Sequence, residues 1–305
     1  MKNKIKQTVL FFAILIALIL SIQKVVDISY NKHSLNKINL LLEHKIDCNV
    51  MVWGSSVALV QIDPTIIEKE TGLSCYNEGW HGTFFVQYNA LMKEFLSYSK
   101  ECKYMIVACD FDNLGKNELI TRPDMYLSHL SNKKIYQSLY EIEPEKIWRA
   151  KYIPGYKFGL LNKIFYKGVI GLGERRNSLK GYEPYNCIWD KSADSAKTFY
   201  ARFDDHIYID LKKTINEITS KGIKVILISP PVYAKGYALI QNAEQIKEKY
   251  HSLSDNNNVY YIDYTIDTIC QNKLYFYNNS HMNIGGATKF SEHLAKNISQ
   301  IINKK

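Results

Sequence analysis

Apolar residues occur along the chain in short continuous runs that alternate with segments of helical spacing. The runs at 50–53, 74–76, 104–109, 224–229 and 259–262 predict five strands. Helical spacing predicts helices over 64–71, 86–98, 205–221 and 287–302, the first with Asp63 as its N-cap and Pro64 as its first residue. Strands that are apolar throughout are buried on both faces, so we expect an α/β fold with a doubly wound, parallel five-stranded sheet.

The N-terminal segment has the pattern of a membrane anchor. Residues 9–22 are apolar apart from Ser21 and follow Lys2, Lys4 and Lys6. This run is short for a span of about 20 residues, but the residues up to Val26 can extend it. No small-residue cleavage site follows, so we expect an uncleaved signal anchor over 1–27, a juxtamembrane helix over 28–47 and a domain over 48–305.

The alternation of strands and helices is interrupted between about residues 115 and 200, a stretch rich in Tyr, Trp, Lys and Arg. One interpretation is a helical insertion packed on the edge of the sheet. The other is a lid whose aromatic side chains contact sugar rings and whose basic side chains contact an anionic glycan.

The sequence Gly171-Leu172-Gly173 lacks a preceding strand and the full dinucleotide spacing, so it does not predict a cofactor loop.

Composition narrows the classes of partner. The 305 residues carry a formal net charge of +9, which suits anionic polymers or membrane surfaces. The other interpretation is that many of the lysines are solvated surface residues. No basic helix or motif indicates nucleic acid. Among the six cysteines, Cys48 and Cys102 each precede a predicted strand and could approach disulfide range if those strands are neighbours. The spacing of Cys and His predicts no metal site, and we expect no cofactor.

A candidate motif follows each predicted strand. These motifs are Ser56, residues 77–82, residues 110–113, Pro230-Pro231 and Asp263. Ligands of parallel sheets bind beyond the carboxyl ends of the strands, so these residues should line one active cleft.

Two motifs at opposite ends of the chain indicate serine chemistry. Gly54-Ser55-Ser56 forms a tight turn after the first strand, and Asn278-Asn279-Ser280-His281 precedes the last helix. A serine becomes a nucleophile when a base lies within hydrogen-bond reach. If these motifs carry no chemistry, Ser56 is a helix cap and His281 is a helix-entry or surface residue.

These motifs resemble those of the SGNH (GDSL-like) hydrolase superfamily. Within it the chain is most similar to the membrane-anchored, envelope-facing proteins that include alginate-type polysaccharide O-acetyltransferases and teichoic acid D-alanylation proteins. The similarity extends to Ile62-Asp63-Pro64, Tyr76-Asn77-Glu78-Gly79, Ser229-Pro230-Pro231 and Tyr261-Ile262-Asp263. The resemblance implies an SGNH or flavodoxin-like fold.

The resemblance also implies residue roles. Ser56 would be the nucleophile, His281 the general base, and Gly79 or Gly82 an oxyanion donor; Asn113 is the candidate for the family's oxyanion asparagine. Asn278 stands where the family has an aspartate. Its amide can orient the imidazole but gives little charge stabilisation, so Asp263, Asp110 and Asp112 are candidates for a substitute acid.

The expected function is therefore acyl-ester chemistry, either O-acetyl transfer or esterase activity, on a cell-surface polysaccharide. The protein would be a single-pass protein of the cytoplasmic membrane with its catalytic domain outside the cytoplasm, and a membrane-bound acyltransferase is a candidate partner. The alternative is a catalytically weak, SGNH-like glycan-binding module of an envelope biosynthesis complex.

Overall fold

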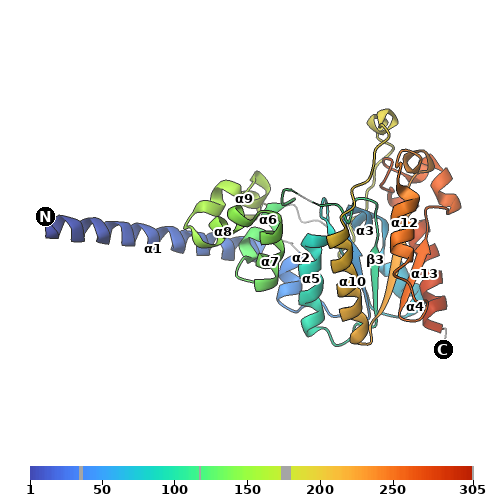
Figure 1. Ribbon diagram of the computed structural model, residues 1–305, viewed down its shortest axis with the longest axis horizontal. Coiled ribbons are helices and arrows are strands. Elements are labelled where there is room, and N and C mark those ends of the chain that lie inside the picture. Colours follow the sequence, from blue (N-terminus) through green and yellow to red (C-terminus); the bar gives the residue numbers. More distant parts are fainter. Residues whose placement is uncertain (34–36, 117, 173–179, 304–305) are drawn as a thin grey trace. The chain divides into compact units, whose positions relative to one another are not determined.

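The structure, a computed structural model, describes residues 1–33, 37–116, 118–172 and 180–303. The chain divides into two compact units (Figure 1). Met1–Glu43 and Glu118–Arg176 form the first, here called the helical unit. His44–Asn117 and Asn177–Lys305 form the second, called the sheet unit. Each unit is described separately.

The sheet unit contains a parallel sheet of five strands. These are β1 (Val50–Gly54), β2 (Cys75–Gly79), β3 (Tyr104–Ala108), β4 (Lys224–Ser229) and β5 (Val259–Asp263), in the order β2-β1-β3-β4-β5. The predicted α/β class and parallel five-stranded sheet are confirmed. Strand β2 is longer than expected, because Asn77 and Glu78 pair with Val52 and Trp53 of β1 although both are polar. Both are fully buried.

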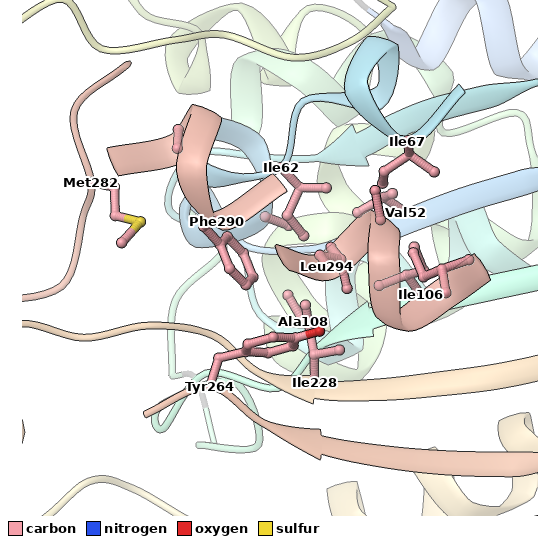
Figure 2. Close-up of a cluster of buried hydrophobic side chains, with 14 of the residues drawn as sticks. Val52, Ile62, Ile67, Ile106, Ala108, Ile228, Tyr264, Met282, Phe290 and Leu294 are labelled. Atoms are coloured by element: carbon pink, nitrogen blue, oxygen red, sulfur yellow. The ribbon is translucent and has the colours of Figure 1, made fainter. Parts of the chain in front are cut away.

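Alternate residues of each strand face opposite layers of helices. Val52 belongs to the core that Phe290 and Leu294 of α13 (Ile284–Asn303) fill from one side (Figure 2). The neighbouring Trp53 points to the other face, where its ring lies 6.1 Å from that of Phe95 in α5 (Phe85–Tyr98). Helices therefore cover both faces, as the continuously apolar strands predict.

The remaining helices of the sheet unit are short connections or lie beside these two layers. They are α3 (Ser56–Gln61), α4 (Pro64–Thr71), α10 (Asp205–Ser220), α11 (Ala234–Tyr237), α12 (Ala243–His251), and the 3-10 turns η3 (Lys191–Ser195), η4 (Thr268–Gln271) and η5 (Lys273–Tyr275). The predicted cap of α4 is confirmed, since Asp63 Oδ1 accepts the Thr65 N–H at 2.8 Å. The sequence did not predict α12, in which Ala243, Ile246 and Tyr250 supply a narrow apolar face.

The helical unit contains α1 (Lys2–His33), α2 (Lys37–Leu42), α6 (Pro123–Tyr126), η1 (Leu127–His129), α7 (Lys133–Ile142), α8 (Pro144–Tyr152), η2 (Tyr156–Leu160) and α9 (Lys163–Val169). Helix α1 is long and apolar enough to cross a membrane. It continues past residue 27, so the expected boundary between anchor and juxtamembrane helix is not a break in the helix.

The expected insertion at 115–200 is divided between the two units. Its helices lie between residues 123 and 169 and belong to the helical unit. The described residues from Lys180 onward belong instead to the sheet unit: Lys180 O accepts the Asn77 N–H at 2.9 Å, and Glu183 N–H donates to Leu59 O at 3.1 Å. Residues 180–200 form no α-helix, and these backbone hydrogen bonds attach them to the rest of the sheet unit.

We expect Gly79→Ala to destabilise the sheet unit, because a Cβ at Gly79 would lie 2.4 Å from the backbone N of Leu59 in α3. Helix α3 would have to move away from β2, at a cost of about 1–3 kcal/mol. Gly285→Ala is the matched control, since its Cβ would meet nothing closer than 3.5 Å in α13. Thermal unfolding should show a lower midpoint for Gly79→Ala alone; equal midpoints for the two variants would contradict the close contact.

Candidate active site

Ser55 and Ser56 lie at the turn between β1 and α3. Ser55 is the N-cap of α3, where its Oγ accepts the Val57 N–H at 3.3 Å and donates a hydrogen bond to Asp110 Oδ2. Ser56 is the first helical residue, and its side chain points elsewhere. Two adjacent serines therefore have different partners: one is a cap held by a carboxylate, and the other is available to a base.

Ser56 and His281 form a close hydrogen-bonded pair. Ser56 Oγ lies 2.7 Å from His281 Nε2, and His281 Nδ1 lies 3.1 Å from Asn278 Oδ1. An N–H at Nδ1 that donates to Asn278 Oδ1 leaves the Nε2 lone pair to accept the Ser56 hydroxyl, which is the tautomer that a general base requires.

The Asn278 side chain is fixed with its oxygen toward the imidazole. Its Oδ1 also accepts the N–H groups of Ser280 and His281, each at 2.9 Å. The amide nitrogen of Asn278 cannot accept these hydrogen bonds, so the backbone N–H groups of Ser280 and His281 fix the orientation of the amide. Asn278 thus positions the imidazole without supplying a charge.

The loop that carries His281 is anchored on both sides. Met282 is fully buried in the core (Figure 2) and forms an antiparallel bridge with Phe276, while His281 O accepts the Tyr277 N–H at 2.8 Å. Gln61 of α3 donates from Nε2 to Ser280 O at 2.8 Å. The loop is therefore attached to the same short helix that begins with Ser56.

Burial keeps His281 neutral. Desolvation, and secondarily the charge of His81, lower the pKa of His281 to about 4. The ring is thus an unprotonated hydrogen-bond acceptor at neutral pH, but a weak base.

Asp110 has the opposite shift. Burial raises its pKa to about 6, against the lowering effect of the Ser55 hydrogen bond. A carboxyl whose folded-state pKa lies above its ordinary value keeps its proton to a higher pH than it would in water. The buried interior of the site therefore disfavours charge on both its histidine and its aspartate.

The structure does not bring the expected substitute acids to His281. Both oxygens of Asp263 are occupied, Oδ2 by Lys247 Nζ at 2.9 Å and Oδ1 by the N–H and hydroxyl of Thr265. Asp112 accepts the Arg202 N–H at 2.9 Å. Asp110 contacts Ser55, as described above, so Asn278 is the residue that orients the imidazole.

Two of the three expected oxyanion donors already donate hydrogen bonds to other groups of the sheet unit. The Gly79 N–H donates to Asn77 Oδ1 at 2.8 Å, and its missing side chain allows α3 to approach β2. Asn113 is buried and donates from Nδ2 to the hydroxyl of Tyr88. Gly82, with a positive φ of 62°, is the one of the three that lines the cleft beside Ser56.

A cleft of about 230 Å³ opens next to the Ser56–His281 pair. Its volume is below the 300–1,000 Å³ typical of sites for drug-sized ligands, which suits a small group. Polar residues, including both serines and the two aspartates of the 110–112 loop, line one part of it. The remainder is mostly apolar and is lined by Val57, Phe84, Phe111, Phe199, Pro230, Val232 and Ile240.

Phe199 and Tyr185 were not predicted as site residues. Phe199 reaches the cleft because it forms a parallel bridge with Ile240. The ring of Tyr185 lies between two histidines, 5.7 Å from His81 and 6.2 Å from His281. Both residues come from the stretch of 180–200 that has no periodic apolar pattern, so nothing in the sequence indicated their positions.

All six cysteines are free thiols in the structure. Strands β1 and β3 are neighbours, as the expected proximity of Cys48 and Cys102 requires, but no disulfide joins them. Among the described residues, no group of three His, Cys, Asp or Glu side chains is arranged to hold a metal ion.

Comparison with models of known protein families gives no match to this chain. Comparison with curated proteins gives none either. Function is therefore inferred from the geometry of the site.

Asp110 should make stability depend on pH. Because its folded-state pKa is about 6, above the ordinary 3.8, the folded protein binds this proton more tightly than the unfolded chain does. That contribution is complete below about pH 4 and is lost as the pH rises through 6, by at most about 3 kcal/mol. In thermal unfolding from pH 4 to 7, Asp110→Asn should therefore gain stability relative to wild type as pH rises. Parallel curves for the two proteins would contradict this account.

Proposed function

We propose that this protein is an extracytoplasmic, membrane-anchored serine enzyme of the SGNH type that transfers or hydrolyses a small acyl group on a cell-surface polysaccharide. The observation that carries the proposal is the 2.7 Å contact between Ser56 Oγ and His281 Nε2, with Asn278 behind the ring. The strand order 2-1-3-4-5 supports it, because Ser56 and Asp110 follow β1 and β3, the two strands between which that order reverses.

The reaction needs two acyl transfers. Ser56 Oγ attacks the acyl carbonyl carbon while His281 Nε2 accepts the hydroxyl proton, giving a tetrahedral oxyanion. The oxyanion collapses, the carbonyl–oxygen bond to the donor alcohol breaks, and His281 returns the proton to that alcohol. A hydroxyl of the glycan, or water, then attacks the acyl-enzyme by the same steps, and Ser56 is regenerated.

The cleft supports a small acyl group such as acetyl. Its volume leaves little room beyond the reacting atoms, and its apolar wall suits a methyl group. The polymer would remain outside the cleft, where the net charge of +9 favours an anionic glycan. A membrane-bound acyltransferase partner would bring the acyl donor to the membrane in which α1 is anchored.

A catalytically weak glycan-binding module is the second candidate. It is favoured by the neutral Asn278 in the position of the acid, and by the structural use of the Gly79 amide and the Asn113 side chain. These features reduce charge stabilisation in the transition state while leaving the cleft and its surroundings intact.

A fluorophosphonate probe separates the two candidates. If Ser56 is activated, the full-length protein is labelled, and Ser56→Ala abolishes the labelling. Ser280→Ala is the matched control, because Ser280 lines the same cleft and should leave labelling unchanged. Absence of Ser56-dependent labelling and turnover would reject the enzyme in favour of the binding module.

Asn278→Asp should increase hydrolysis of an activated acetyl ester, because a carboxylate stabilises the imidazolium that forms when Ser56 loses its proton. We expect a gain of at least about tenfold, with an upper limit near the roughly 10⁴-fold by which the reverse change slows a serine protease. The pKa of His281 should rise from about 4, so the acid limb of the pH–rate profile should move to higher pH.

In a Ser56→Ala background the gain from Asn278→Asp should disappear. Asp263→Asn is a further control, since Asp263 is bound to Lys247 and not to His281. If Asp263→Asn abolished turnover while Asn278→Asp had no effect, the acid would have been misassigned.

A further inference from the structure

Within the helical unit, the segments after residue 118 contact α1 along one stripe, and that stripe begins within the apolar part of α1. Residues 2–18 of α1 are exposed, whereas Ile19, Gln23, Val26, Asp27 and Tyr30 are partly or fully buried. Their spacing places them on one face of the helix. The partners of this stripe are in α9, in η2 and in the N-cap of η2: Tyr30 stacks on Phe165, Lys157 pairs with Asp27, and the Gly155 N–H donates to Gln23.

Membrane thickness fixes the depth of this stripe. This step rests on α1 spanning the membrane, which is part of the proposed function. A hydrocarbon core of about 30 Å needs about 20 helical residues at 1.5 Å each. Counted from the residue after Lys6, the core ends near Val26, so Ile19 lies about 10 Å inside it. Even if the core ended at Ile22, Ile19 would lie about 4.5 Å inside.

The turn after α8 lies at that depth. A Cβ on Gly155 would be 3.1 Å from Ile19 Cγ2, and the Gly155 N–H donates to Gln23 Oε1 at 3.1 Å. Gly155 has a positive φ of 79°. The turn therefore packs against the part of α1 that lies inside the lipid.

The backbone of this turn is suited to an apolar medium. The N–H groups of Ile153, Tyr156 and Phe158 donate to the carbonyls of Arg149, Ile153 and Gly155 at 2.9, 3.2 and 3.1 Å. Pro154 has no N–H, and Gln23 satisfies that of Gly155. Irregular backbone is costly in hydrocarbon because water cannot satisfy its donors; here, these donors are paired within the protein.

Three apolar or aromatic side chains near the turn are exposed, beside the charged Arg149 and Lys151 of α8. Trp148, Tyr152 and Ile153 are 48%, 55% and 40% exposed. Trp148 and Tyr152 contact each other at 5.6 Å, and Lys151 Nζ lies 3.8 Å from the ring centre of Tyr136. Trp, Tyr and Lys with apolar neighbours form the composition that anchors proteins at the membrane–water interface.

We propose that Trp148, Tyr152 and the Ile153–Gly155 turn are immersed in the outer leaflet of the bilayer that α1 spans, so that the helical unit is seated on the lipid surface. The occupant of this face is lipid, because the face continues directly into the membrane-spanning part of α1.

Tryptophan quenching tests the proposal on the full-length protein in phosphatidylcholine nanodiscs whose acyl chains carry bromine at a known depth. Of the four tryptophans, Trp53 and Trp80 are buried, Trp189 is half-buried and Trp148 is exposed. The difference between wild type and Trp148→Phe therefore reports on Trp148. We expect this component to be quenched, most strongly by bromine near the headgroup, and its emission to be blue-shifted.

Ile153→Asp should remove most of the quenching of Trp148, since a carboxylate is costly in hydrocarbon. Tyr152→Asp is a second variant, in case the first disturbs α8. Ile266→Asp is the matched control, because Ile266 is 80% exposed in the sheet unit, and quenching should not change. Circular dichroism and probe labelling of Ser56 check that each variant is folded.

A Trp148 component that is not quenched, although α1 remains in the bilayer on flotation, would overturn the proposal. Protection of Trp148 only in native membranes would assign the face to a protein partner and would overturn it equally. If the chain fails to float with lipid, the anchor and this inference both fail. Ser56-dependent labelling, measured on the same samples in detergent, tests the enzyme proposal independently.

Discussion

The close contact between α3 and β2 at Gly79 determines where the reactive groups of the sheet unit lie. A side chain at Gly79 would overlap the backbone of Leu59, so only glycine permits this separation. Asn77 reinforces the contact from the same strand, because its Nδ2 donates to the carbonyls of Ala58 and Ile62 at 2.8 and 2.7 Å. Buried polar groups that are fully paired in this way specify one arrangement. The position of Ser56, at the start of α3, follows from it.

The same helix connects the two ends of the sequence. Gln61 holds the loop before His281, and Ser291 of α13 accepts the Asp63 N–H at 2.8 Å while donating to Gln61 O at 3.2 Å. The hydrogen bond between Ser56 and His281 thus joins segments that are fixed to one short helix. This explains how a serine and a histidine 225 residues apart can keep a separation suited to proton transfer.

Much of the fold could be predicted because its signals are local. Apolar runs defined the strands to within a few residues, and Asp63-Pro64 defined the start of α4. The parts that were missed depend on contacts distant in sequence. Asn77 and Glu78 are strand residues only because β1 pairs with them, and Phe199 enters the cleft only through its bridge to Ile240.

The sequence indicated which residues lie at the candidate site, but not which hydrogen bonds they make. Ser56, His281 and Asn278 could be chosen by motif and are close together in the structure. The sequence could not show that Lys247 and Thr265 occupy Asp263, or that the Gly79 amide is bonded to Asn77. Motifs specify which residues follow each strand, whereas the partner of each polar group depends on the packing around it.

In the proposed reaction, His281 must become an imidazolium next to Asn278, which is uncharged, and this step costs free energy. With a pKa of about 4, the imidazolium is about 3 kcal/mol harder to form than on an unperturbed histidine. Asn278 accepts one hydrogen bond from the ring but cannot recover this cost as a carboxylate would. Asp110 is bonded to Ser55 and not to the imidazole, so it does not take the place of that carboxylate. A site of this kind must therefore obtain most of its transition-state stabilisation from the bound substrate and from backbone donors at the cleft. That requirement favours a polymer held by many contacts outside the cleft over a small free ester as the natural substrate.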